Sequence, residues 1–235
     1  MRLAFGVGLA FFATSAAIAP EMILVAYLGG SGTDDCDGIT LDSVGDIYLA
    51  CHSDSPDFPH LSRRAVSQSR DAMDAVVVKV EARTGRLAWA TRTGGSAWDA
   101  AGDITVARDG SIYVLGSTRS TDFPTTTDAV QRRFGGPDRD VFLLKLDAMG
   151  KIVYSTLLGG LKNDEATGLA VGEDGAVFIG GVTMSADFPG SRAAQFGPGS
   201  QYDAFIAQLR PGDPNEVIGT GAELMVFSGT QNCCR

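Results

Sequence analysis

Acidic side chains gather behind a Gly-Gly pair at three places in this chain. They are Asp34, Asp35 and Asp37, then Asp99 and Asp103, then Asp164 and Glu165. Clustered carboxylates supply the oxygen ligands that Ca²⁺ takes. They also cap turns, because an Asp side chain accepts hydrogen bonds from nearby backbone N–H groups. No group contains a complete Asp-x-Asp-x-Asp-Gly loop, so turn capping and calcium both stay open, with Asp34, Asp35 and Asp37 as the calcium candidates.

A further acid stands in an Asp-Phe-Pro motif that occurs three times. The motifs are Asp57, Phe58 and Pro59, then Asp122, Phe123 and Pro124, then Asp187, Phe188 and Pro189. Each Asp could form one ligand subsite per unit. It could also bond its own loop, with the Phe filling a gap between units and the Pro fixing the chain direction. The same motif recurs in every unit, as scaffolding does, and this favours the structural role.

Catalytic patterns are sparse. The only histidines are His52 and His60, which have no counterparts in the other units and are predicted to lie in an exposed loop. No Gly-x-Ser-x-Gly elbow is present. Carboxylate pairs are plentiful in an acidic chain, so a hydrolase or lyase that acts on carbohydrate through such a pair stays an alternative. Calcium is the one cofactor that the sequence suggests.

These residues are held by a repeat with a fixed period. The Gly-Gly pairs are Gly29 and Gly30, Gly94 and Gly95, and Gly159 and Gly160. Successive pairs are 65 residues apart, and so are successive Asp-Phe-Pro motifs. Two unrelated motifs that keep one period indicate a tandem array, whose architecture follows from the repeat unit.

Each unit is predicted to form four short antiparallel strands. In the middle unit these are residues 102–106, 111–116, 140–146 and 151–156, with an Asp-Gly hairpin turn at Asp109 and Gly110. The second and third strands are apolar on both faces, whereas a half-exposed strand would alternate. Each sheet is therefore expected to lie between two others. This arrangement is typical of the blades of a β-propeller, and a two-sheet sandwich would not explain the strict period.

The units resemble the SBBP-type repeat of bacterial β-propellers. The best matching stretches are residues 120–126, which read Ser-Thr-Asp-Phe-Pro-Thr-Thr, residues 140–146 and residues 154–160. The likeness extends over nearly all of residues 22–230. It implies a propeller fold in an exported or cell-surface bacterial protein, and it brings no catalytic residues with it.

The strand count predicts an incomplete ring. Outer strands are expected four times, at residues 22–27, 86–91, 151–156 and 224–228, against three of each other strand. The chain would then hold three full blades and one extra N-terminal outer strand, whereas propellers close with four or more blades. Two apolar blade faces would stay uncovered. We expect two or more copies to complete one ring; the alternative is a shortened relative of longer arrays.

The two ends of the chain are predicted to lie outside the folded domain. Residues 1–19 have an Arg, an apolar run and a small-x-small cleavage site, as a signal peptide does, and the alternative is a membrane anchor. The folded domain is expected at 20–230 and a short tail at 231–235. Signal cleavage would leave no membrane span, and the protein would be secreted, periplasmic or on the cell surface.

Four cysteines accompany this predicted export. Cys36 and Cys51 replace small residues of the other units on neighbouring strands, so either a disulfide or two free thiols are expected there. The pairing of Cys233 and Cys234 stays open. Zinc is disfavoured, because two histidines and one adjacent Cys pair do not have the spacing of its ligands.

Charge and fold together narrow the function classes. The formal net charge is −9, which repels phosphate backbones and argues against nucleic acid. The sequence therefore predicts an exported, non-catalytic module that binds a glycan or a surface protein. The alternatives are the carbohydrate-active enzyme and a purely structural surface module.

Overall fold

The computed structural model describes residues 26–61, 72–189 and 202–211, together with the backbone of residues 225–227. Within this part of the chain the structure is all β, with twelve strands and no helix. Each successive set of four strands forms one antiparallel sheet, here called a blade. This confirms the predicted array of four-stranded blades. The described residues accordingly include no helix that could cross a membrane.

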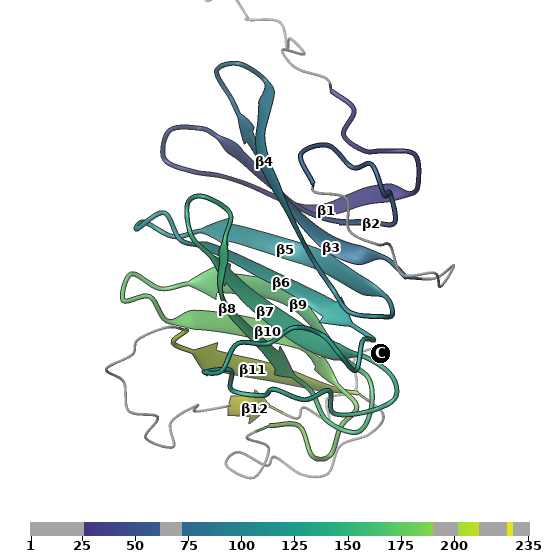
Figure 1. The fold of residues 1–235 in the computed structure, drawn as a ribbon. Coiled ribbons are helices and arrows are strands. Elements are labelled where there is room, and N and C mark those ends of the chain that lie inside the picture. The colour runs from purple at the N-terminus through teal and green to yellow at the C-terminus, as the bar shows by residue number, and fades with distance from the viewer. Residues whose placement is uncertain (1–25, 62–71, 190–201, 212–224, 228–235) are drawn as a thin grey trace, which may run out of the picture.

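The three blades follow one another along the chain and stack face to face (Figure 1). Blade 1 contains β1 (Asp34–Leu41), β2 (Ile47–Ser53), β3 (Asp74–Glu81) and β4 (Arg86–Thr93). Blade 2 contains β5 (Asp99–Val106), β6 (Ile112–Thr118), β7 (Asp140–Leu146) and β8 (Ile152–Leu158). Blade 3 contains β9 (Asp164–Val171), β10 (Val177–Thr183), β11 (Asp203–Leu209) and β12 (Met225–Phe227). We call β1, β5 and β9 the inner strands, because neighbouring blades approach each other most closely there.

The hairpin after each inner strand follows directly from its sequence. Gly110 has a φ of 83° between β5 and β6, a conformation that residues with a Cβ avoid. Asp109 Oδ1 accepts the Ser111 N–H at 2.9 Å and closes the turn. Gly45 and Gly175 hold the same place in the other blades, with φ of 88° and 78°. The predicted turn is therefore present in every blade.

Apolar side chains fill both gaps between blades. Blade 1 contributes Tyr48, Ala50, Ala75 and Val77 to the first core, which also contains Ile104, Ile112, Val114, Phe142 and Leu144 of blade 2. The second core combines Tyr113, Leu115, Val141 and Leu143 of blade 2 with Val177, Ile179, Phe205 and Ala207 of blade 3. Strands β6 and β7 thus bury both faces, as their sequences indicate. Each large side chain so buried stabilises the fold by about 1.5–3 kcal/mol.

The Phe of the repeated motif packs against a second Phe in blades 2 and 3. Phe123 stacks on Phe142 with ring centroids 4.7 Å apart, and in blade 3 the corresponding rings lie 4.5 Å apart. Gly116 pairs with Phe142 across the strands, and a Cβ there would overlap the ring. In blade 1 these two places hold Cys51 and Val76, which form one buried cluster with the motif's Phe.

Blade 1 differs from the others by a covalent link between its first two strands. Cys36 and Cys51 are directly paired positions of β1 and β2, and their sulfur atoms form a disulfide 2.02 Å long. The disulfide therefore occupies the position where the other blades have a glycine beneath a Phe ring. Cys233 and Cys234 lie outside the described residues.

The predicted outer strands have different outcomes. At the C-terminal side, β12 falls within the predicted residues 224–228 and pairs with β11. At the N-terminal side, residues 22–25 lie outside the described part, and Ala26 and Tyr27 are in no strand, with Tyr27 fully exposed. The proposed signal peptide at 1–19 and the tail at 231–235 also lie outside it.

Candidate binding site at the rim of the blades

Every blade carries the same hydrogen-bonded loop where its inner strand begins, and blade 2 shows it in full. Asp99 Oδ2 accepts the Gly95 N–H at 2.7 Å and the Ser120 hydroxyl at 2.8 Å. Its Oδ1 accepts the hydroxyl of Thr118, the last residue of β6. One carboxylate therefore ties the Gly-Gly loop before β5 to the end of the neighbouring strand. Asp34 and Asp164 occupy the equivalent positions, and each accepts the N–H of its own Gly-Gly pair at 2.7 Å.

The Asp of the Asp-Phe-Pro motif completes this loop. Asp122 Oδ1 accepts the N–H of Ser96 at 2.8 Å and its hydroxyl at 2.9 Å. Asp57 accepts the Ser31 N–H at 2.7 Å, and Asp187 accepts the N–H of residue 161 at 3.0 Å. The glycines are needed for this close approach, since a Cβ on Gly30, Gly95 or Gly160 would overlap these carboxylates. The three-fold recurrence of these bonds is what a scaffold role requires.

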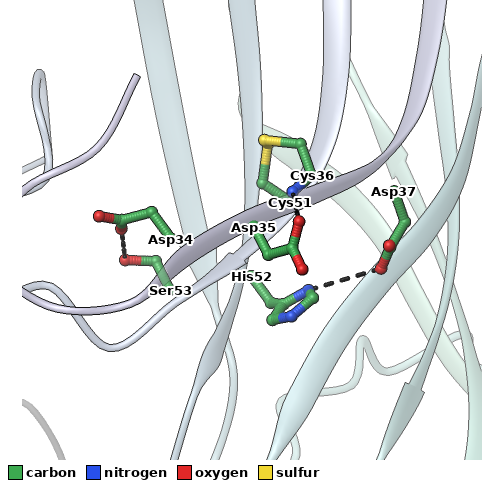
Figure 2. Close-up of a disulfide and its surroundings, with 7 residues drawn as sticks. All are labelled: Asp34, Asp35, Cys36, Asp37, Cys51, His52 and Ser53. Atoms are coloured by element: carbon green, nitrogen blue, oxygen red, sulfur yellow. Dashed lines mark hydrogen bonds and ion pairs between the residues drawn. A yellow bond between two sulfur atoms is a disulfide. The ribbon is translucent and has the colours of Figure 1, made fainter. Parts of the chain in front are cut away.

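The calcium candidates point to different partners. Asp34 accepts the Ser53 hydroxyl at 2.6 Å, and Asp37 Oδ2 lies 3.6 Å from His52 Nδ1 (Figure 2). Asp35 accepts the N–H of the next residue at 2.8 Å. Across the part of the chain that the structure describes, no three His, Cys, Asp or Glu side chains gather as metal ligands. Calcium binding stays a prediction; Asp34 and Asp35 accept backbone N–H groups, and Asp37 contacts the His52 side chain.

Several of the loop carboxylates are fully buried, and this alters their acidity. Burial raises the pKa of Asp99 to about 6 and that of Asp140, the first residue of β7, to about 7. The nearby carboxylates of Asp164 and Asp187 also raise the pKa of Asp140, whereas the Gly135 N–H, 2.7 Å away, lowers it. Burial likewise raises the pKa of Asp164. These acids are shielded from solvent, so a dissolved sugar polymer does not reach them in this conformation.

A partly exposed tryptophan with two arginines stands at the same end of the blades. Trp98 directly precedes Asp99 in the loop from β4 to β5. The guanidinium carbon of Arg139 lies 4.8 Å from its ring centroid, and that of Arg119 lies 5.7 Å away. Arg139 also pairs with Glu165. Within the described residues Arg119 has no ion pair, and its side chain is exposed. Cation–π contacts of this kind hold both arginines beside the indole.

An open depression of about 520 Å³ adjoins Arg119, between blades 2 and 3. It is lined by Arg119, Pro137, Asp138, Asn163, Met184 and Tyr202. All of these residues come from loops at one end of the blades, where β6 and β10 end and where β7, β9 and β11 begin. Tyr202 is 60 % exposed, so its ring is available to a ligand. We call Trp98, Arg119, Arg139, Asn163, Met184 and Tyr202 together the rim site.

The rim site lies on positions where the repeats disagree in sequence but agree in backbone. Arg119 donates its N–H to the Trp98 carbonyl at 2.8 Å. The equivalent bond joins Asp54 to Thr33 in blade 1, at 3.2 Å, and Met184 to Asn163 in blade 3, at 2.9 Å. The same backbone hydrogen bond therefore joins two positions in every blade, and the pair of side chains at these positions differs from blade to blade. None of these residues belongs to a recurring motif, so the repeat pattern did not predict them; their divergence within the period is the signal in the sequence that marks them.

The histidines differ in position. His60 lies in a turn, as predicted, with a φ of 62°. The predicted exposed loop position of His52 is wrong, because His52 is in β2 with a side chain only 14 % exposed. Its ring centroid is 6.3 Å from that of Trp98, so it supports the indole of the rim site. In the sheet, His52 is the register partner of Asp35 on β1 and of Ala75 on β3, so β2 continues past Cys51.

Blades of this construction, joined by a repeated capped loop, define a β-propeller-type repeat array. Residues 25–59 match the family model of the SBBP beta-propeller repeat, which agrees with the resemblance seen in the sequence. The chain is also similar to the regulatory protein FlaEY of Caulobacter vibrioides, with 32 % identity over 135 residues. That match covers 57 % of this chain and 14 % of the relative, so the chain spans only a small part of that protein's length.

Proposed function

We propose that this chain is an exported, non-catalytic repeat module that binds an acidic glycan at the rim site. The observation that carries the proposal is Trp98 with the guanidinium groups of Arg119 and Arg139 beside its ring. An exposed aromatic ring offers a flat apolar surface to the C–H face of a sugar, while a guanidinium binds a carboxylate through paired N–H groups. The two features side by side suit a uronic acid residue.

The two arginines of the rim site counteract the overall electrostatics of the chain. The formal net charge is −9, which repels anions in general, so the guanidinium groups beside Trp98 are a local exception that would attract a carboxylate. The charge of Arg139 is shared with Glu165, whereas that of Arg119 is left for a ligand. Tyr202 and the open depression beside Arg119 extend the surface, so that more than one sugar unit can be in contact with it.

Export is part of the proposal. The Cys36–Cys51 disulfide suits an oxidising compartment, and the N-terminal sequence has the features of a signal peptide. Cell fractionation with N-terminal sequencing of the product tests this part. We expect an extracytoplasmic protein that begins at residue 20.

Titration calorimetry with defined oligosaccharides tests the binding. The probes are an oligogalacturonate and a neutral cello-oligosaccharide of equal length. We expect saturable binding of the acidic probe, weaker binding of the neutral one, and roughly a tenfold loss of affinity in Trp98→Ala, since a cation–π and stacking contact is worth about 1–2 kcal/mol. Thr33→Ala, at the equivalent position of blade 1, is the matched control and should bind as the unaltered chain does.

The same samples separate the module from the enzyme. After prolonged incubation, chromatography of the oligosaccharide should show no shortened or unsaturated product. Product formation that a single Asp substitution abolishes would establish a hydrolase or lyase instead. An equal affinity of Trp98→Ala and the unaltered chain would contradict the rim site.

A further inference from the structure

Each junction inside the chain buries the same two kinds of blade face. We call the face toward the following blade the trailing face and the face toward the preceding blade the leading face. Tyr48 and Val77 on the trailing face of blade 1 share a core with Ile104 and Val114 on the leading face of blade 2. Blades 2 and 3 repeat this arrangement. The chain therefore contains two interfaces that show how one blade packs on the next.

Two such faces have no blade against them within the described residues. On the leading face of blade 1, Ile39 is 68 % exposed, whereas the equivalent Ile104 is 3 % exposed. On the trailing face of blade 3, Phe178 is 40 % exposed, whereas the equivalent Tyr113 is 2 % exposed. Ile206 of β11 is also 43 % exposed. Apolar side chains at equivalent positions are thus buried between blades and exposed to solvent at the two ends of the described array.

The exposed part of blade 1 lies at its inner strand. Further out on this face, Val76 and Val78 are buried in a cluster that also contacts Leu28 and Leu61. Ile39 and Leu41 of β1 stay exposed, and inner strands are where neighbouring blades come closest in this chain. The available surface is therefore the part that an adjoining blade would contact first.

Blade 3 resembles blade 1 at the position where the inner strand of the next blade would approach. At the junction of blades 1 and 2, Gly38 of β1 lets the inner strand of the next blade approach, and a Cβ there would come within 2.9 Å of the Gly102 carbonyl oxygen. Gly168 of β9 holds the position equivalent to Gly38, and a Cβ there would meet nothing within 4 Å. Gly180 beside it corresponds to the small Ala50 of blade 1. The trailing face of blade 3 thus matches the one on which the leading face of blade 2 already packs.

We infer that a second copy of this chain covers both faces, with the trailing face of blade 3 of each copy packed on the leading face of blade 1 of the other. The two junctions are related by one twofold axis, so both open faces close at once. The product is a ring of six blades, which is within the range over which propellers close. Exposed apolar faces of this kind are otherwise rare on stable monomers.

Light scattering after size-exclusion chromatography of the mature chain tests this inference. We expect twice the mass of one chain, and a single-chain mass for Ile39→Asp and for Phe178→Asp, because each places a charge in both junctions. Met149→Asp, at an 80 % exposed position in a hairpin turn away from the two faces, is the control and should stay dimeric. Circular dichroism should give the same β spectrum and thermal unfolding for all folded monomers.

A mixture of the two monomeric variants sharpens the test. Ile39→Asp keeps an intact trailing face and Phe178→Asp an intact leading face, so the mixture should regain a dimer joined by one junction. A single-chain mass for the unaltered protein at about 100 µM would overturn the inference and would fit faces covered by further blades of a longer chain. A mass that grows without limit, or a dimer that survives both substitutions, would overturn it as well.

Discussion

The loop scaffold and the rim site occupy the same short segments, yet they differ in recurrence and in the hydrogen bonds of their side chains. Asp99 and Asp122 recur in each blade, are tied to backbone N–H groups, and hold the loop in place. The partly exposed Trp98 and the exposed Arg119 lie within a few residues of them and recur in no other blade. In this chain recurrence thus accompanies a structural role, and divergence accompanies the side chains that we propose for recognition. If the two roles are separate, substitutions of the two kinds of residue should differ in their effects on stability and on binding.

The largest effect is expected at a recurrent core residue. Phe123→Ala removes a buried ring that stacks on Phe142, and such truncations cost about 3–5 kcal/mol. Urea unfolding followed by circular dichroism measures the change in the free energy of unfolding. Trp98→Ala, the paired control, should change that free energy by less than about 1 kcal/mol, since its ring is only partly buried. Equal losses in the two variants would contradict the division of roles.

A somewhat smaller effect is expected for the disulfide, which only blade 1 has among the described residues. Replacing Cys36 and Cys51 by Ala opens a link between residues 15 apart in sequence, and closing a loop of that size stabilises by about 3 kcal/mol. Unfolding of the double variant in urea should show this loss. Unaltered stability would mean that Phe58 and Val76 hold blade 1 together without the link.

A pH dependence is expected from the buried carboxylates. The pKa of Asp140 rises from 3.8 to about 7 on folding, so the folded chain binds a proton more tightly than the unfolded chain. The stabilisation is complete below about pH 4 and is lost as the pH rises through about 7. The free energy of unfolding should therefore be higher at pH 5 than at pH 8. Asp140→Asn should flatten this difference, and an unchanged pH profile in that variant would show that other groups cause it.

Much of the fold was predictable because the sequence repeats the same structural unit three times. The period of 65 residues located the blades, and Asp109 with Gly110 located the hairpin of the middle unit, which the period extends to the other units. The strand position of His52 could also have been predicted from the repeat, because the equivalent Ser117 and Val182 lie inside strands. The histidine itself has no counterpart in the other units, and it therefore suggested a loop. The extra N-terminal outer strand was expected from residues 22–27, and its described end at Tyr27 is not in a strand.

The sequence marks the rim positions only by their divergence between units, and it does not show which of them meet in space. Trp98 meets Arg139 only after β6 and β7 have folded back, so the contact joins residues that no local pattern relates. The burial that raises the pKa of Asp99 and Asp140 is likewise a property of the stacked blades. Sequence alone predicted a binding module without the residues of its binding surface, and our proposal of the rim site rests on side chains that only the fold brings together.

The most direct test replaces the divergent pair of blade 2 by that of blade 3. The double variant Trp98→Asn with Arg119→Met keeps the shared backbone bond between the two positions and changes only the displayed side chains. Calorimetric titration with the oligogalacturonate, alongside urea unfolding, gives affinity and stability from one preparation. We expect at least a tenfold weaker affinity, with the free energy of unfolding preserved to within about 1 kcal/mol. Retained affinity, or a collapse of stability, would contradict this expectation.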